Sequence, residues 1–202
     1  MDTCYLFGAG EISGLTEPPK GYIIAADGGC DGLRRLGIVP NLIIGDLDSL
    51  QGDLPDGVEI IRHPIRKDYT DMHLAYLEGA KRGFTDFEIY GGTGGASDHT
   101  FANYCLLLYG KRQRHTLRLR DELSTARVIE NEKITLHGVL GHRLSVFAIG
   151  GEAQGVSIKG AEYEADDVTL SPEFPLGVSN AFTGRDVTLR VRQGALLIIT
   201  EN

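Results

Sequence analysis

Two aspartates separated by one residue follow an apolar run near the middle of the first half of this 202-residue chain. Asp46 and Asp48 lie in the segment 45–49 (Gly-Asp-Leu-Asp-Ser), directly after the apolar run 42–44. If the backbone turns there, both carboxylates can converge on one hard cation, and Mg²⁺ in proteins usually bridges one or two carboxylates to substrate phosphates. Gly, Asp and Ser also form ordinary solvated turns. The position after a predicted strand, with similar segments elsewhere, favours a metal site.

A second acidic segment, 67–71 (Lys-Asp-Tyr-Thr-Asp), precedes a predicted helix. Thr70 is a typical N-cap residue, and an acid at Asp71 would interact favourably with the helix dipole. These structural roles account for Thr70 and in part for Asp71. They do not account for Lys67, whose ammonium group could neutralise phosphate oxygens.

The glycine-rich segment 91–99 (Gly-Gly-Thr-Gly-Gly-Ala-Ser-Asp-His) also lies between a predicted strand and a predicted helix. Its glycines let the backbone approach a ligand and direct amide groups at phosphate, and the following helix N-terminus favours anions. The segment lacks the Lys-Ser/Thr ending of a Walker A loop. Asp98 could ligate a metal, accept a proton or cap the helix. A lone histidine such as His99 is more often a hydrogen-bonded structural residue than a catalyst, so we interpret His99 as structural.

Two shorter glycine segments complete the pattern. The segment 26–29 (Ala-Asp-Gly-Gly) by itself predicts a tight turn with a cap, and 8–10 (Gly-Ala-Gly) is weaker because Ser13 replaces the third glycine of a dinucleotide fingerprint. No GxSxG, HExxH or Cys/His zinc pattern competes. The gathering of acidic and glycine-rich segments at predicted strand ends indicates a metal–nucleotide site.

The elements that must position these residues alternate between strands and helices over about the first 120 residues. This alternation predicts an α/β domain with a mostly parallel sheet, helices on both faces, and ligand binding at the carboxyl ends of the strands. Buried strands are expected at 4–7, 22–26, 42–44, 58–61 and 87–90, and helices at 70–82 and 98–109.

The pattern changes after about residue 123, where short, often alternating apolar segments are separated by glycine-containing turns. Helical periodicity is absent there, which predicts an all-β sandwich or small barrel. We therefore expect two domains, residues 1–123 and 124–202. The strands of the second are expected at 133–136, 143–149, 156–158, 168–170, 187–191 and 195–200.

Composition excludes several classes of partner. The net charge of −8 argues against nucleic-acid binding, which normally needs a basic face. No apolar run is long enough to cross a membrane, so no membrane association is expected. The widely spaced Cys4, Cys30 and Cys105 favour reduced thiols. The expected location is the cytoplasm.

Taken in order, the segments 25–29, 45–49, 67–71 and 94–99 resemble the motif series of the thiamine pyrophosphokinase family, and Asn103 stands where that family has an asparagine. The C-terminal half is similar too, at 160–163 (Gly-Ala-Glu-Tyr), 177–180 (Gly-Val-Ser-Asn) and 194–197 (Gly-Ala-Leu-Leu). Each motif alone is weakly specific, whereas the full series covers nearly the whole chain.

The resemblance implies an enzyme that transfers pyrophosphate from ATP to thiamine in the presence of Mg²⁺, giving AMP and thiamine diphosphate. It implies a homodimer with active sites between subunits, in which the α/β domain binds ATP and Mg²⁺ and the β domain helps to bind thiamine. The implied Mg²⁺ ligands are Asp46, Asp48 and Asp71, with Asp98 as a further acidic residue, and Asp71 or Asp98 would accept the proton. Residues implied around the nucleotide are Asp27, Gly28, Ser49, Lys67, Asp68, Thr70, Gly92, Thr93, Gly94, Gly95, His99 and Asn103. Ser179, Asn180 and Phe182 are implied at the thiamine pocket, Phe182 as a stacking candidate.

Two departures from the family pattern stand out. Ala96 replaces an arginine of the glycine loop, so Lys67, Arg66 or a second metal ion would have to neutralise the phosphates, and the chain has no Trp to stack on thiamine. Two alternatives therefore stay open. One is a pyrophosphokinase for another hydroxymethyl heterocycle such as a pterin, and the other is a non-catalytic thiamine or nucleotide sensor. The closely spaced aspartates argue against a sensor, because they repel one another without metal.

Overall fold

The computed structural model describes residues 3–47 and 54–202, so Asp48 and Ser49 lie outside the described residues. The described residues form two compact units. Unit 1 comprises the described residues up to Leu106 together with Arg114–Glu122. Unit 2 comprises Leu107–Gln113 and Leu123–Asn202.

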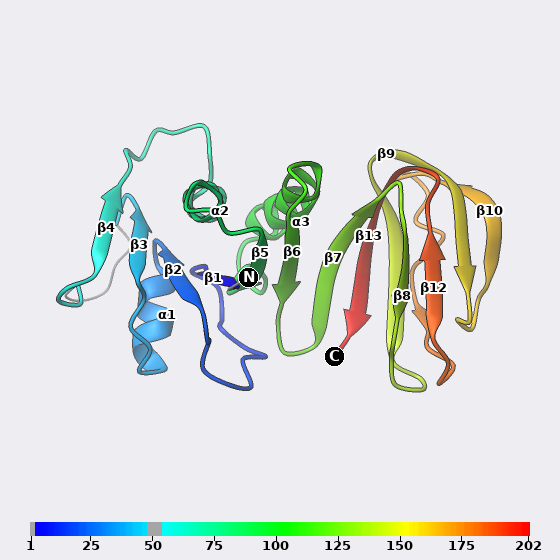
Figure 1. Cartoon of the computed structure of the whole chain (residues 1–202), viewed down its shortest axis with the longest axis horizontal. Helices are drawn as coiled ribbons and strands as arrows, with labels where there is room; N and C mark the ends of the chain where they lie inside the picture. Colours follow the sequence, from blue (N-terminus) through cyan, green and yellow to red (C-terminus); the bar gives the residue numbers. More distant parts are fainter. Residues whose placement is uncertain (1–2, 48–53) are drawn as a thin grey trace. The chain divides into compact units, whose positions relative to one another are not determined.

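Unit 1 is built on a parallel sheet with the strand order β4-β3-β2-β1-β5-β6 (Figure 1). Its strands are β1 (Cys4–Phe7), β2 (Tyr22–Ala26), β3 (Leu42–Gly45), β4 (Glu59–Arg62), β5 (Asp86–Tyr90) and β6 (Thr116–Arg120). Its helices are α1 (Gly29–Arg35), α2 (Asp71–Lys81) and α3 (Ser97–Arg112), the last of which ends in unit 2. The expected α/β architecture is confirmed.

Both faces of this sheet are covered because neighbouring residues of each strand point to opposite sides. On one face, Ile23 and Ala25 of β2 belong to a buried cluster with Leu33 of α1. On the other face, Gly79 of α2 lies against Cys4, its Cα being so near that an added Cβ would be 3.2 Å from the Cys4 sulfur. This double coverage explains why the strands are nearly continuous apolar runs.

The strand β4 differs from the expectation of a buried strand. Three of its four residues are exposed, and it pairs with β3 alone. It is the edge strand of the sheet, where one side of the backbone and much of the side-chain surface face solvent.

The order of the strands reverses between β1 and β5. From β1 the chain proceeds outward through β2, β3 and β4, whereas β5 and β6 lie on the opposite side of β1. At the carboxyl ends of these two strands the amide of Gly8 donates to the carbonyl of Tyr90 at 2.8 Å, and that of Gly10 donates to the carbonyl of Gly91 at 2.9 Å. Doubly wound sheets bind ligands at this kind of switch point.

Unit 2 consists mainly of antiparallel strands, as expected. They are β7 (Ser124–Glu130), β8 (Lys133–Leu136), β9 (Arg143–Lys159), β10 (Ala165–Leu170), β11 (Asn180–Ala181), β12 (Val187–Arg190) and β13 (Gln193–Glu201) (Figure 1). However, β7 and β11 were not expected, and the strands expected at 143–149 and 156–158 are one continuous strand, β9. The first part of β9 pairs with β13 and β11, and its second part pairs with β12 and β10. Because β9 changes partners at Gly150 and Gly151, which both have positive φ, it joins two layers around one apolar core.

The helices in the described part of the chain include none with the length and apolar character needed to cross a membrane.

Candidate active site

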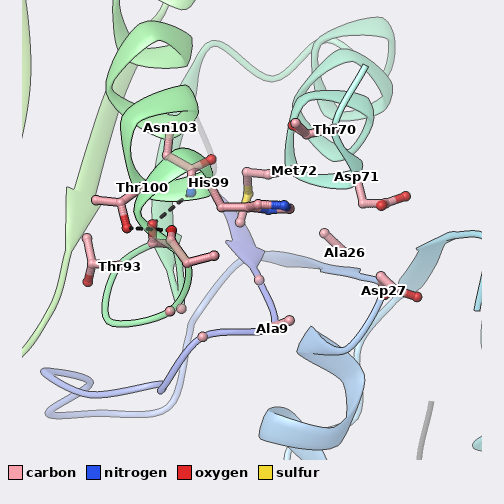
Figure 2. Close-up of a pocket in the computed structure, with 16 residues that line it drawn as sticks. Ala9, Ala26, Asp27, Thr70, Asp71, Met72, Thr93, His99, Thr100 and Asn103 are labelled. Carbon is pink, nitrogen blue, oxygen red and sulfur yellow. Dashed lines mark hydrogen bonds between the residues drawn. The ribbon is translucent and has the colours of Figure 1, made fainter. Parts of the chain in front are cut away.

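A pocket of about 300 Å³ opens at the carboxyl edge of the parallel sheet in unit 1. Its walls come from the loop after β1, the end of β2, the start of α2, the glycine loop after β5 and the first turns of α3 (Figure 2). The pocket therefore lies at the switch point of the sheet. Segments that are up to about 90 residues apart in sequence meet there because parallel strands deliver their carboxyl ends to one edge.

The loops after β1 and β5 approach each other so closely that glycine is required. A Cβ on Gly10 would lie 2.5 Å from the carbonyl oxygen of Thr93, and a Cβ on Gly8 would lie 2.6 Å from that of Gly91. Gly91 itself has φ +62°, in the left-handed region. These glycines give the pocket a floor of backbone, which can approach a ligand more closely than side chains would allow.

The glycine loop is fixed by the buried side chain of Asn103. Its amide nitrogen donates to the carbonyl of Gly92 at 2.8 Å, as the dashed line in Figure 2 shows. At the next residue of the loop, the Thr93 hydroxyl donates to an Asp121 carboxylate oxygen at 3.0 Å. Because both bonds hold the loop from the protein side, its shape is set before any ligand arrives.

Acidic side chains gather at one side of the pocket around the end of β3. Gly45, with φ +152°, is so close to them that a Cβ there would lie 3.1 Å from Cβ of Asp27 and 3.2 Å from Oδ1 of Asp71. Asp27 and Asp71 both line the pocket, and Figure 2 shows them on the same side of it. The end of β3 thus lies beside Asp71, an expected metal ligand, and beside Asp27, which was expected near the nucleotide.

Lys67 joins the two predicted metal ligands that the structure describes. Its Nζ lies 2.6 Å from Oδ1 of Asp71 and 3.4 Å from Oδ2 of Asp46. Two carboxylates that share one ammonium group present oxygens to a common point, and this is the ligand type that Mg²⁺ requires. The donor type of Asp46 and Asp71 is therefore compatible with a divalent metal ion, although the described residues contain no group of three or more potential metal ligands.

The charge of Lys67 is stabilised by these contacts. Burial acts to lower the pKa of Lys67, but the hydrogen bond and charge of Asp71, together with those of Asp46, hold that pKa above its ordinary value. The ammonium group is consequently charged throughout the physiological pH range.

The start of α2 combines a structural and a pocket role. The Thr70 hydroxyl accepts a hydrogen bond from the amide of His73 at 3.2 Å and so caps the helix. Thr70 and Met72 also line the pocket. On the opposite side, His99 extends from the first turn of α3 into the pocket (Figure 2).

Several predicted nucleotide-site residues lie outside the lining that the described residues define. Asp68 and Gly94 are exposed, and Gly28 precedes α1 as its N-cap residue. Asp98 is exposed as well, and its carboxylate accepts the amide of His99 at 2.8 Å. The pocket brings together Asp27, Thr70, Asp71, Gly92, Thr93, Gly95, His99 and Asn103.

The predicted thiamine-site residues lie in unit 2, where each makes internal contacts. The amide of Ser179 donates to the hydroxyl of Ser145 at 3.1 Å, and the residue has φ +58°. The side chain of Asn180 accepts from the amide of Tyr163 at 2.9 Å and donates to its carbonyl at 2.7 Å. Phe182 is 2% exposed and belongs to the core of the unit. Contacts of these residues with thiamine stay a prediction.

Sequence reasoning missed part of the pocket. The segment 8–10 lines it, as do Met72 and Thr100, although the glycine pair after β1 ranked as the weakest motif. Its position at the switch point could have identified it, but that position depends on which strands are neighbours. Ala96 also lines the pocket, and its carbonyl accepts from the Thr100 amide at 3.1 Å, while its methyl side chain supplies no charge.

Comparisons with known proteins cover both units. The family model "Thiamin pyrophosphokinase, catalytic domain" matches residues 18–119, and "Thiamin pyrophosphokinase, vitamin B1 binding domain" matches residues 128–196. The chain is 24% identical over 195 residues to the thiamine pyrophosphokinase of Bacillus subtilis (strain 168), covering 94% of this chain and 91% of that protein.

Solved structures show the same fold. A crystal structure of thiamine pyrophosphokinase from Bacillus subtilis matches with a TM-score of 0.87 and 21% identity, covering 99% of each chain. A thiamin pyrophosphokinase family protein from Enterococcus faecalis matches with a TM-score of 0.86 and 22% identity, covering 100% of this chain and 99% of the other.

Proposed function

The chain belongs to the thiamin pyrophosphokinase family, and we propose that it transfers a pyrophosphoryl group from ATP to the hydroxyl of thiamine, giving thiamine diphosphate and AMP. One observation carries the proposal. The pocket at the switch point has a glycine backbone floor and is lined by Asp27 and Asp71, and Asp71 shares the Lys67 ammonium group with Asp46. These three aspartates lie in the region that matches the catalytic-domain model.

The nucleotide phosphates would bind against the glycine loop and the N-terminus of α3. Gly92, Thr93 and Gly95 line the pocket there, and α3 is 16 residues long. Backbone amides and the helix dipole both favour an anion at such a place. The remaining nucleotide-site predictions, Gly28, Ser49, Asp68 and Gly94, are carried here by the family motif alone.

Mg²⁺ would be held by Asp46 and Asp71, with Asp48 added by the motif. When bound, the ion neutralises phosphate charge as it develops in the transition state. The fit of Asp46 and Asp71 to a cation is supported by their shared contact with Lys67. Asp27 lies beside them and would complete the acidic wall.

In the reaction, the thiamine hydroxyl oxygen forms a bond to the β-phosphorus of ATP, the bond from that phosphorus to the α-phosphate oxygen breaks, and AMP leaves. Catalysis of this kind consists mainly of positioning and charge stabilisation. The hydroxyl proton passes to a carboxylate. Asp71 is the better placed acceptor, since it lines the pocket, whereas the Asp98 carboxylate lies outside the lining and accepts the amide of the adjacent His99.

Unit 2 would bind thiamine. We assign residues 1–123 to the nucleotide-binding domain and 124–202 to the thiamine-binding domain, in keeping with the vitamin B1 binding model over 128–196. Ser179, Asn180 and Phe182 would shape the thiamine pocket. Since Phe182 is buried in the core, it would support the pocket wall more readily than stack on the ligand.

The family further suggests a homodimer with active sites between subunits and a cytoplasmic location, both of which we adopt as proposals. Light scattering on the purified protein measures the first directly, and a mass of one chain, 21.9 kDa, would contradict it.

The experiment that tests the function is AMP release from ATP and Mg²⁺ with and without thiamine. We expect AMP only when thiamine is present, with one thiamine diphosphate formed per AMP. A hydroxymethyl pterin serves as the competing acceptor, and AMP formation with the pterin but not with thiamine would contradict the proposal. Binding of thiamine or ATP without any AMP would favour the sensor, which the family match does not favour.

A further inference from the structure

Lys67 occupies the place between two carboxylates that the proposed function gives to a metal ion. We propose that Lys67 is a positioning residue that holds Asp46 and Asp71 together until the metal binds, and then exchanges those carboxylates for the phosphates of the nucleotide. The inference rests on the proposed function for the identity of the metal and the nucleotide.

Lys67 contacts the carboxylates of Asp46 and Asp71. Asp46 follows β3 and Asp71 begins α2, so their carboxylates come from different elements. Like charges brought together repel one another. The Lys67 ammonium group, 2.6 Å from Asp71 and 3.4 Å from Asp46, removes that repulsion.

The ion pair between Lys67 and Asp46 is largely buried. The side chain of Lys67 is only 12% exposed, and that of Asp46 only 14%. Partial burial weakens solvent screening, so the charges interact more strongly than an exposed pair would. The ammonium group therefore both stabilises the metal-free carboxylates and competes with any cation for the same oxygens.

The position of Lys67 beside the pocket gives its ammonium group a second partner, the nucleotide phosphates. The residue precedes α2 and reaches Asp71 from outside the helix, on a flexible four-carbon side chain. Thr70 and Asp71 line the pocket next to it. Because Ala96 provides no cation there, an ammonium group displaced by metal would find its counter-charge on the phosphates.

The test is a calorimetric titration of Mn²⁺ into the nucleotide-free protein, comparing the wild type with Lys67→Met and Arg66→Met. Arg66→Met is the matched control, because it removes one positive charge from the neighbouring residue. We expect Lys67→Met to bind Mn²⁺ about tenfold more tightly than the wild type, which corresponds to about 1.4 kcal/mol. Arg66→Met should bind Mn²⁺ as the wild type does. Metal-free Lys67→Met should also unfold at a lower temperature.

The second arm adds the α,β-methylene analogue of ATP, whose altered bridge resists cleavage of the bond that breaks in the reaction. With the metal present, Lys67→Met should bind this analogue more weakly than the wild type, so the effect of one substitution changes sign between the two ligands. Lys67→Gln, checked by circular dichroism, repeats both arms with a polar side chain.

Two results would overturn the inference in distinguishable ways. Equal or weaker Mn²⁺ binding by Lys67→Met would show that Lys67 does not compete with metal, and would leave the proposed function intact. Mn²⁺ binding by neither the wild type nor the variants would remove the metal site from the proposed function, and the exchange with it.

Discussion

Asp46, Asp71 and Asp98 look alike in the sequence, but the structure gives them different surroundings. Asp46 and Asp71 share one ammonium group at the end of β3. Asp98 is exposed and accepts the backbone amide of His99. The proposed metal role therefore belongs to the first two, and the Asp98 carboxylate has a local contact in the first turn of α3.

This difference predicts unequal effects of removing a charge. Asp46→Asn should lower kcat by about 10²–10³-fold, the size of effect seen when one transition-state contact is lost. Asp98→Asn should retain most of the activity, because the side chain at this position lies outside the pocket lining and an asparagine oxygen can accept the His99 amide as the aspartate does. The rate of AMP release measures both, with circular dichroism as the control for folding. Equal losses in the two variants would contradict the distinction.

At the level of single residues, the sequence predicted a shared region for the acidic side chains but not their contacts. Asp46 and Asp71 were grouped as metal ligands by the family resemblance, whereas Lys67 was expected at the phosphates, and its ion pairs with both aspartates were not predicted. Asn180 was chosen from a family motif and Phe182 as an aromatic residue in a chain without Trp, and neither choice indicates that the amide holds Tyr163 or that the ring joins the core. These contacts are made with residues outside the segment 177–180, and the segment itself does not encode them.

At the scale of elements, the pocket depends on two loops that touch only because each is rich in glycine. The loop after β1 donates hydrogen bonds to carbonyls at the end of β5 and just after it, and this packing leaves no room for a Cβ at Gly8 or Gly10. Gly95 differs, since a Cβ there would meet nothing within 4 Å and its φ is not positive. The glycines of the pocket therefore serve two purposes, loop packing and access for the ligand.

Alanine substitutions should separate these purposes. Gly10→Ala should lower the free energy of unfolding by about 1–3 kcal/mol, since its Cβ would press on the carbonyl of Thr93. Gly95→Ala should leave stability unchanged and raise the KM for ATP, because its Cβ would stand where phosphate approaches the backbone. Chemical denaturation and initial rates measure the two effects. A Gly10→Ala protein with wild-type stability, or a Gly95→Ala protein with wild-type KM, would refute the corresponding role.

Most strands and helices of unit 1 were predictable from the sequence, whereas the order of the strands in the sheet was not. Apolar runs and caps place most strands and helices of unit 1 within a few residues of those observed, as for α2, expected at 70–82 and found at Asp71–Lys81. The exposed edge strand β4 and the pocket role of residues 8–10 both follow from strand order. Strand order is set by long-range packing, which no local periodicity encodes.

At the scale of the whole molecule, two histidines make stability depend on pH. Burial lowers the pKa of both His73 and His115. His115 shares a hydrogen bond of 2.8 Å with the hydroxyl of the buried Tyr76, and His73 packs against the ring of Tyr69. In the unfolded chain both would titrate near the ordinary value of about 6.5.

The sign of the effect follows from proton binding. As the pH falls below about 6.5, the unfolded chain takes up protons that the folded protein resists, so the free energy of unfolding decreases. Each histidine contributes a slope of at most about 1.4 kcal/mol per pH unit, and the contribution is fully present above that range. We expect His115→Gln to flatten the decline between pH 6.5 and 5 in denaturant titrations. An unchanged slope would exclude His115 as a source of it.

A change of periodicity near residue 123 predicts two domains, and the family resemblance covers both parts. The compact units of the structure divide the chain differently at one place. The segment Leu107–Gln113, which includes the last part of α3, belongs to unit 2, and the continuous periodicity of the helix gives no sign of this division. The assignment of this segment to unit 2 depends on contacts between residues that are distant in the sequence, which local spacing does not encode.

The measurement that tests the central claim most directly follows two labels of ATP, one at the β- and one at the γ-phosphorus, into the thiamine product. Intact transfer of the pyrophosphoryl group predicts both labels in thiamine diphosphate in equal amounts, together with an equal amount of AMP. Recovery of the γ-label alone in the thiamine product with formation of ADP, or of both labels as free pyrophosphate, would contradict it.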